Sequence, residues 1–274
     1  EQLDVILFSG DAYIDHPAFG AAVIGRLLEA EGYRVAIVPQ PNWRDDLRDF
    51  TKLGTPRLFF GITAGSMDSM VNHYTANIRL RSNDAYTPGG KAGFRPDYAV
   101  RVYTQIVKRL FPHVPVVVGG IEASLRRLTH YDYWNDSLKP SVLAESGADL
   151  LIYGMGERVV QQVARALRNG YNAKLLRKLR QVAFMAGKDY VERLDPAETI
   201  RLHSYEECAR DNRAFGENFT VIETQSNLME PTATLVEAVG DRYVVVTPPN
   251  TTLTTEELDH SFDLPYERAP HPRY

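Results

Sequence analysis

The chain lacks several features that would direct its interpretation at once. A single cysteine, Cys208, excludes an internal disulfide and any site built from several thiolates of this chain. No apolar run approaches the roughly 20 residues of a membrane span, and no basic N-terminal flank precedes an apolar signal core. The 31 basic and 35 acidic residues nearly balance, so neither nucleic acid nor an anionic membrane is indicated as the main partner. We therefore expect a cytoplasmic protein.

Short apolar runs alternate with helical patterns over the first 170 residues. The sequence predicts strands at 3–8, 33–39, 57–63, 114–120 and 148–154. It predicts helices at 17–32, 97–111, 141–147 and 157–169. Strands that are continuously apolar and alternate with helices indicate a parallel sheet covered on both faces. The predicted fold class is α/β, a doubly wound five-stranded parallel sheet with the flavodoxin-like strand order 2-1-3-4-5.

The remaining residues follow a less regular pattern. We expect a helix at 172–181, a hairpin of strands 182–187 and 189–194, and a helix from Tyr205 with a capping box of Ser204 and Glu207. A strand at 241–249, a short helix and a proline-rich extended tail follow, and such a tail suits a connector to another domain. The sequence is therefore divided into residues 1–170, a Rossmann-like domain, and 171–274, a smaller α+β elaboration.

Polar and glycine-rich stretches follow four of the predicted strands. In open α/β sheets, ligands bind outside the carboxyl ends of the strands, where the strand order reverses. The segment 64–97 is also far longer than the usual connection of about 2 to 6 residues, which is typical of functional loops. The candidate cofactor-binding residues are Gly10, Asp11, Asp15, His16, Gly65, Ser66, Asp68, Gly119, Gly120, Glu122, Gly154, Gly156 and Glu157.

Several of these residues also have a structural interpretation. Asp15 is of a type that caps helices and Pro17 suits a first turn, so we expect both mainly to start the helix. Lone histidines are usually structural, and no second metal ligand accompanies His16. We therefore expect no metal site and no catalytic residue in this chain, and we expect Asp11 and His16 to face the crevice.

Each of the other candidates, taken alone, suits a structural role as well as a binding role. Glycines are common after parallel strands whatever the turns bind. Glu157 suits equally the start of its helix and a ribose hydroxyl. Two further groups are interpreted as structural, an aromatic cluster packed under a loop and a solvated basic pair: Tyr131, Tyr133, Trp134, Arg126 and Arg127. Together they indicate a binding site, because all these stretches are expected at one edge of one sheet.

Long motifs in the chain resemble a known family. They include "GDAYIDHPAFGAAVIGRLLEAEGYRVAIVPQPNW", "FFGITAGSMDSMVNHYTA" and "VVVGGIEASLRRLTHYDYWNDS". Over nearly its whole length the chain resembles the N-terminal region of YgiQ-type radical SAM proteins. The stretches "HPAFGAAVIGRLLEAEGYRV", "VVVGG" and "LLIYGMGE" are similar to the cobalamin-binding-like Rossmann domain that precedes the barrel in many radical SAM enzymes.

The resemblance implies a longer enzyme. Such a protein would continue past Tyr274 into a partial TIM barrel, where a C-x3-C-x2-C motif holds the [4Fe–4S] cluster that cleaves S-adenosylmethionine. That motif is absent here, so the chain alone is expected to have no radical chemistry. The implied role is an accessory domain that accommodates cofactor or substrate beside a C-terminal radical SAM domain of the same polypeptide, with the substrate unidentified.

Cobalamin is a further cofactor that the resemblance suggests. Domains of the methionine synthase type carry Asp-x-His-x-x-Gly, whereas here His16 directly follows Asp15 and three residues separate it from Gly20. A lower ligand from His16 is therefore not expected, and cobalamin rests on fold analogy. A flavin or nucleotide phosphate is disfavoured because acidic residues follow Ser9 and Gly10.

A different class of function is also compatible with these patterns. The chain would then be a non-catalytic interaction module on a Rossmann-like fold. Its long segment 64–97 and the aromatic cluster would recruit a macromolecular partner.

Overall fold

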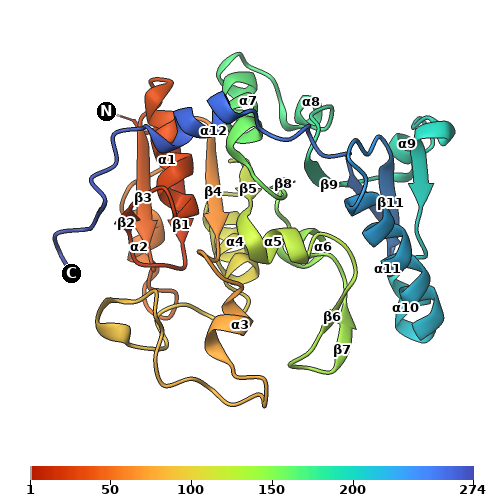
Figure 1. Cartoon of the computed structure of the whole chain (residues 1–274), viewed down its shortest axis with the longest axis horizontal. Coiled ribbons are helices and arrows are strands. Elements are labelled where there is room, and N and C mark those ends of the chain that lie inside the picture. Colours follow the sequence, from red (N-terminus) through yellow and green to blue (C-terminus); the bar gives the residue numbers. More distant parts are fainter. Residues whose placement is uncertain (1) are drawn as a thin grey trace.

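The computed structural model describes residues 2–274, which build a nine-stranded sheet with helices on both faces (Figure 1). Five strands of the sheet are parallel to one another: β1 (Val5–Ser9), β3 (Val35–Pro39), β4 (Phe59–Thr63), β5 (Val116–Val118) and β8 (Leu150–Ile152). Their spatial order is β3-β1-β4-β5-β8, which reads 2-1-3-4-5 when these five are numbered along the chain. The predicted α/β class with a mostly parallel sheet is confirmed.

The sheet is larger than the five strands that the sequence predicted. It continues beyond β8 with β9 (Val182–Ala186), β12 (Arg242–Val246), β11 (Thr234–Val239) and β10 (Thr199–Arg201). The pairs β8–β9, β9–β12 and β12–β11 are antiparallel, and β10 is parallel to β11. Residues 171–274 therefore extend the sheet of the first 170 residues.

Alternating residues of the parallel strands fill two hydrophobic cores. Val5 and Leu7 pack in the core that contains α1 (Gly20–Ala30) and α7 (Glu157–Arg168). Ile6 and Phe8 pack on the other face, in the core that contains α4 (Ala99–Leu110) and α6 (Val142–Ser146). Both faces of β1, β4, β5 and β8 are largely buried, which explains their continuous apolar runs, whereas the edge strand β3 is only partly buried.

The other elements are short, apart from α11. The remaining helices are α2 (Arg48–Thr51), α3 (Ser69–His73), α5 (Gly120–Leu125), α8 (Ala173–Leu176), α9 (Lys188–Val191), α10 (Tyr205–Arg210), α11 (Asn212–Ser226) and α12 (Thr255–Phe262). The 3-10 turns are η1 (Pro88–Gly90) and η2 (Pro196–Glu198). Two small sheets pair β2 (Ile14–Asp15) with β13 (Ala269–Pro270) and β6 (His130–Asp132) with β7 (Ser137–Lys139). Among residues 2–274, no helix is both long and apolar enough to cross a membrane.

Predictions for the last hundred residues had mixed outcomes. The strand at 182–187, the strand within 241–249 and the capping box at Ser204 are confirmed as β9, β12 and the start of α10. The second hairpin strand, 189–194, is wrong, because Lys188–Val191 form α9 and the antiparallel partners of β9 are β8 and β12. The helix expected over 172–181 is limited to the four residues of α8. Side-chain patterns of a few residues did not distinguish a turn of helix from a strand.

Helix α1 does not start where the sequence predicted. It begins at Gly20, and its N-cap residue Phe19 makes no side-chain capping hydrogen bond. Pro17 therefore precedes the helix, and Asp15 lies further back in β2. The prediction that Asp15 and Pro17 start the helix is wrong, because the buried Asp15 carboxylate is engaged in other contacts.

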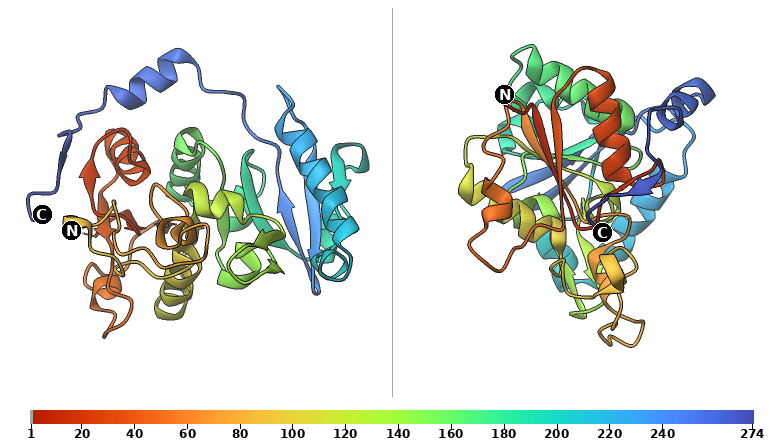
Figure 2. Two further views of the ribbon diagram at one scale, coloured as in Figure 1. Left: turned by 60° about the horizontal axis from the view of Figure 1, so that its bottom comes forward. Right: turned by 90° about the vertical axis from the view of Figure 1, so that its left-hand side faces the viewer.

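Residues 247–274 form a segment that we call the C-terminal strap. It leaves β12, passes α7 through an ion pair of Arg158 with Glu257 at 2.6 Å, and pairs β13 with β2. Figure 2 shows the strap arching from the β12 side of the molecule to the α1 side. The amide of Glu267 donates to Asp15 Oδ2 at 3.0 Å. Asp15 thus anchors the strap.

Candidate functional site

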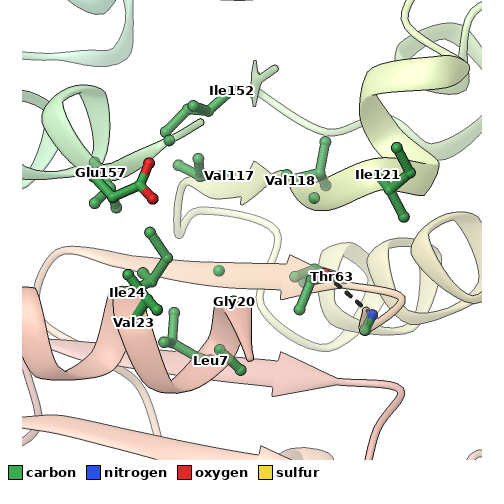
Figure 3. Close-up of a pocket in the computed structure, with 18 of the residues that line it drawn as sticks. Leu7, Gly20, Val23, Ile24, Thr63, Val117, Val118, Ile121, Ile152 and Glu157 are labelled. Carbon is green, nitrogen blue, oxygen red and sulfur yellow. Dashed lines mark hydrogen bonds between the residues drawn. The ribbon is translucent and has the colours of Figure 1, made fainter. Parts of the chain in front are cut away.

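A pocket of about 400 Å³ lies at the carboxyl ends of the parallel strands (Figure 3). Its floor is the face of β1, β4, β5 and β8 that α1 and α7 cover, and these two helices supply the opposite wall. The turns that follow β4, β5 and β8 complete the lining. This volume falls within the range of about 300 to 1,000 Å³ that is typical of ligand sites.

The structure separates the candidate site residues into two groups. Seven line the pocket: Gly65, Ser66, Gly119, Gly120, Gly154, Gly156 and Glu157. Six do not line it: Gly10, Asp11, Asp15, His16, Asp68 and Glu122. The cofactor-binding role of the first group stays a prediction, whereas the second group has internal partners that are described below.

Glycine is required at two turns by the contacts of the chain itself. Gly65 has φ +110°, and a Cβ there would lie 2.0 Å from Asp11 Oδ1. Gly120 has φ +84°, and a Cβ there would lie 2.6 Å from Thr63 Oγ1. Residues with a side chain rarely adopt such positive φ angles, and a Cβ would collide with the neighbouring turn. Glycine at these two positions therefore allows adjacent turns to pack closely.

Glu157 differs from the other lining residues. It is the first residue of α7, and its carboxylate points into the pocket (Figure 3). Its Oε2 atom is buried and has no hydrogen-bond partner. Among the lining residues, all of which the structure describes, it is the one charged side chain.

Asp11 belongs to a buried ionic clamp rather than to the pocket. Arg95 Nη1 lies 3.0 Å from Asp11 Oδ1, and Arg95 Nη2 donates to both oxygens of Asp84 at 3.2 Å. The amide of Ser66 donates to Asp11 Oδ2 at 2.6 Å, and Arg95 Nη1 also donates to Ala64 O. Burial raises the pKa of Asp11, and Arg95 opposes that rise. The clamp holds segment 64–97 against the turn after β1, and Asp11 lies outside the lining of the large pocket.

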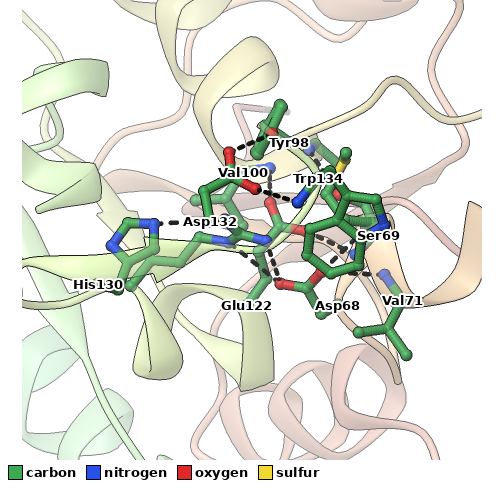
Figure 4. Close-up of polar contacts among 12 residues, drawn as sticks. Asp68, Ser69, Val71, Tyr98, Val100, Glu122, His130, Asp132 and Trp134 are labelled. Carbon is green, nitrogen blue, oxygen red and sulfur yellow. Dashed lines mark hydrogen bonds and ion pairs between the residues drawn. The ribbon is translucent and has the colours of Figure 1, made fainter. Parts of the chain in front are cut away.

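Asp68 and Glu122 form a second ionic clamp (Figure 4). Asp68 caps α3, and Arg126 Nη2 donates to Asp68 Oδ2 at 2.7 Å. Glu122 accepts hydrogen bonds from the amides of Ser69 at 2.8 Å and Val100 at 2.9 Å. Burial raises the pKa of Glu122, and the nearby Asp68 carboxylate raises it further. These contacts join α3, α4 and α5, so both carboxylates are occupied within the fold.

Three candidates near β1 also have local partners. Asp15 accepts a hydrogen bond from Arg26 Nε at 3.1 Å as part of the strap anchor. His16 Nδ1 accepts from the amide of Ala18 at 3.0 Å, and His16 does not line the pocket. A Cβ on Gly10 would lie 2.1 Å from the carbonyl oxygen of Ala64, so this glycine permits two turns to touch.

The basic pair after α5 is not a solvated face. Arg126 is buried in the second clamp, and Arg127 Nη1 donates to Ser124 O at 2.6 Å from a partly buried position. His130 lies 3.4 Å from Arg126, and burial together with that positive charge lowers its pKa to about 4. In the aromatic cluster, Tyr133 donates to Ala76 O at 2.6 Å. That contact joins the β6–β7 hairpin to segment 64–97.

Sequence reasoning missed the apolar part of the pocket. Leu7 and Val117 contribute to the floor, and Val23 and Ile24 of α1 contribute to the opposite wall. One signal was present, because Gly61 interrupts an apolar strand and such glycines mark close approach of another group. In this fold that group is Leu7, whose Cδ2 would lie 2.4 Å from a Cβ on Gly61.

The fold and the pocket together define an α/β domain with a ligand-sized, largely apolar slot at the carboxyl edge of its parallel strands. The whole chain, residues 1–274, matches the family model described as Radical SAM N-terminal, and the chain belongs to this family. The resemblance to the N-terminal region of radical SAM proteins is thereby confirmed. A stand-alone interaction module is not favoured.

Curated relatives of the chain are considerably longer than it is. A UPF0313 protein of Porphyromonas gingivalis is 62% identical over 277 residues, which cover 100% of this chain and 43% of the relative. A UPF0313 protein of Bacteroides thetaiotaomicron is 56% identical and covers 100% of this chain and 46% of the relative. A third, from Rhodopseudomonas palustris, is 47% identical over 99% of this chain and 42% of the relative. The chain thus spans less than half the length of these relatives.

One solved structure is also similar in part. It is a radical S-adenosylmethionine methyltransferase, TsrM, from Kitasatospora setae, with a tryptophan substrate and an S-adenosylmethionine analogue bound. The match has 19% sequence identity and a TM-score of 0.43, and it covers 66% of this chain and 28% of that protein.

Proposed function

We propose that the chain is the accessory domain of a radical SAM enzyme and that its pocket holds part of a cofactor or substrate. The observation that carries this proposal is the pocket itself, which combines ligand-sized volume with seven of the candidate residues. Every lining residue falls within 1–170, so we assign the binding role to that part and the connecting role to 171–274.

The radical chemistry is assigned to the part of the longer relatives that this chain does not match. A [4Fe–4S] cluster that cleaves S-adenosylmethionine requires three thiolates, and Cys208 is a single, buried thiol. The relatives are about twice the length of the chain, which leaves room for a radical SAM domain in the same polypeptide. The cofactors would supply the reactive species, and this domain would bind, orient and exclude water.

We propose that the radical SAM domain of the longer polypeptide covers the mouth of the pocket. Ile121 and Met155 belong to the lining and are nevertheless exposed, and Leu125 is exposed one turn further along α5. Large apolar side chains that cluster around a pocket mouth are typical of a surface that a partner or ligand covers. In this proposal the ligand would lie between residues 1–170 and the radical SAM domain.

Cobalamin is the particular cofactor that we propose for test. The order of the five parallel strands is the order expected of a cobalamin-binding-like domain, and the apolar slot between sheet and helices has room for part of such a molecule. The fit does not extend to a histidine ligand, because His16 lies outside the lining. Binding would therefore depend on the slot alone.

A binding measurement with a blocked pocket tests the proposal. Gly20 lines the pocket, and a Cβ there would meet nothing within 4 Å, so Gly20→Leu adds bulk without a clash. We expect the purified chain to bind hydroxocobalamin by equilibrium dialysis and Gly20→Leu to weaken binding roughly tenfold or more. Gly216→Leu is the matched control, because Gly216 lies in α11 and also has open space.

Native mass spectrometry of the full-length protein from cells complements the dialysis. We expect a retained small molecule that Gly20→Leu removes. A wild-type protein that carries no small molecule and binds no hydroxocobalamin would contradict the proposal.

A further inference from the structure

The pocket has a distinctive balance of charge. Its lining contains no lysine, arginine or histidine, and its polar side chains are Thr63, Ser66 and Glu157. Thr63 Oγ1 accepts a hydrogen bond from the amide of Gly65 at 3.1 Å, and the Ser66 amide is committed to Asp11. No cation is present in the lining to neutralise a phosphate, and the Glu157 carboxylate would repel one. The buried part of a ligand is therefore not anionic.

The shape of the pocket restricts the ligand further. Leu7, Val117 and Ile152 form one apolar wall on the sheet, and Val23 and Ile24 form another on α1 (Figure 3). The two walls belong to successive layers of the fold, so the space between them is a slot. A flat ring buries most apolar surface in such a slot.

Glu157 determines which polar group the ligand must carry. Its buried Oε2 has no hydrogen-bond partner, and a buried acceptor without a partner destabilises the empty pocket. A hydroxyl or N–H group on the ligand would satisfy this atom and recover that free energy. The slot and the carboxylate are adjacent, since Val160 of the same helix also lines the pocket.

We infer that the pocket takes a nucleoside group, with a heteroaromatic base in the apolar slot and a ribose hydroxyl donating to Glu157. This inference rests on the proposed function and specifies the ligand class at that site. A nucleoside combines a flat uncharged ring with hydroxyl donors on one neutral unit, which matches the three properties above. Phosphates attached to it would lie outside the pocket.

A double-mutant cycle tests the hydroxyl contact. Affinities of adenosine and 2′,3′-dideoxyadenosine are measured for the wild-type chain and for Glu157→Ala. We expect the wild type to prefer adenosine by roughly tenfold or more, the range of a hydrogen bond to a charged group. Glu157→Ala should bind the two equally, and Glu157→Gln should keep part of the preference. Glu206→Ala, the same change in the first turn of α10, should leave the preference intact.

A second experiment distinguishes two molecules that could supply the nucleoside group, a corrinoid nucleotide and a free nucleoside. Cobalamin carries a benzimidazole nucleotide, and cobinamide is the same corrinoid without it. A cobalamin preference that Glu157→Ala removes identifies a corrinoid nucleotide as the occupant, whereas an adenosine preference alone identifies a free nucleoside. Both results support the inference.

Other outcomes would overturn it. Equal affinity for adenosine and its dideoxy analogue, together with equal affinity for cobalamin and cobinamide, would refute the nucleoside inference while the proposed function stands. Absence of binding by all four probes would also refute it. If the full-length protein then also carries no small molecule, the proposed function fails as well.

Discussion

Two regions at the same edge of the sheet use polar residues in opposite ways. In the two ionic clamps, Asp11 and Asp68 have arginine partners and Glu122 accepts two amide hydrogen bonds. In the pocket, one oxygen of Glu157 is buried without a partner. In this fold, therefore, a carboxylate that follows a parallel strand is a candidate ligand-binding group only where no internal partner occupies it.

Removal of the first clamp is expected to have the largest effect on stability. Arg95→Met leaves Asp11 and Asp84 buried without their cation, which should lower the free energy of unfolding by about 3 to 5 kcal/mol. Segment 64–97 should also become sensitive to proteolysis. Urea unfolding and limited trypsin digestion measure both effects.

The control for this change is Arg48→Met. Arg48 pairs with Asp46 on the surface, so loss of this ion pair should lower the free energy of unfolding by at most about 1 kcal/mol. If Arg95→Met is no more destabilising than this control, the clamp does not organise the edge.

Another buried carboxylate, Glu237, should make the stability of the fold depend on pH. Glu237 accepts a hydrogen bond from the Thr129 amide at 2.9 Å, and burial raises its pKa to about 7. Because the folded-state pKa lies above the unfolded value, the group favours folding below pH about 4.5 and loses that contribution as pH rises to about 7. The loss should be on the order of 3 kcal/mol.

Urea unfolding across this pH range, with Glu237→Gln, measures the contribution. The variant should lack that part of the pH dependence, while the exposed Glu217→Gln should keep it. A wild-type curve identical to that of Glu237→Gln would show that Glu237 titrates normally.

The strap anchor provides the smallest expected effect. Asp15→Ala removes the contacts with Arg26 and with the Glu267 amide, which should lower the free energy of unfolding by about 2 kcal/mol. Because the strap is then held less firmly, trypsin should cleave after Arg268 more rapidly. Ligand affinity should change by less than about twofold, since Asp15 does not line the pocket. His16→Ala is the control, with about 0.5 kcal/mol or less expected. If Asp15→Ala instead weakened hydroxocobalamin binding tenfold, Asp15 would have to be counted among the ligand-binding residues.

The parallel strands and the location of the site were predictable because they depend on local patterns. Apolar runs such as 57–63 identified strands, and parallel connectivity places all carboxyl ends at one edge. Seven of the thirteen candidate residues selected by that rule line the pocket. Family motifs then specified the class of protein, which the family match confirms.

The remaining features depend on contacts between distant segments. Arg95 and Asp84 lie far along the chain from Asp11, and no spacing in the sequence indicates their ion pairs. Asp15 was misassigned because its partner Glu267 is 252 residues away. The four added strands were missed as part of the same sheet because antiparallel pairing such as β9 with β12 joins segments separated by helices.

Amide hydrogen exchange with saturating hydroxocobalamin shows whether the pocket is the binding site of the domain. We expect slower exchange confined to residues 7–8, 17–24, 59–66, 117–121 and 152–160, the segments that contain the pocket-lining residues. Slower exchange confined to residues 68–73 and 84–97, around the ionic clamps, would contradict this expectation.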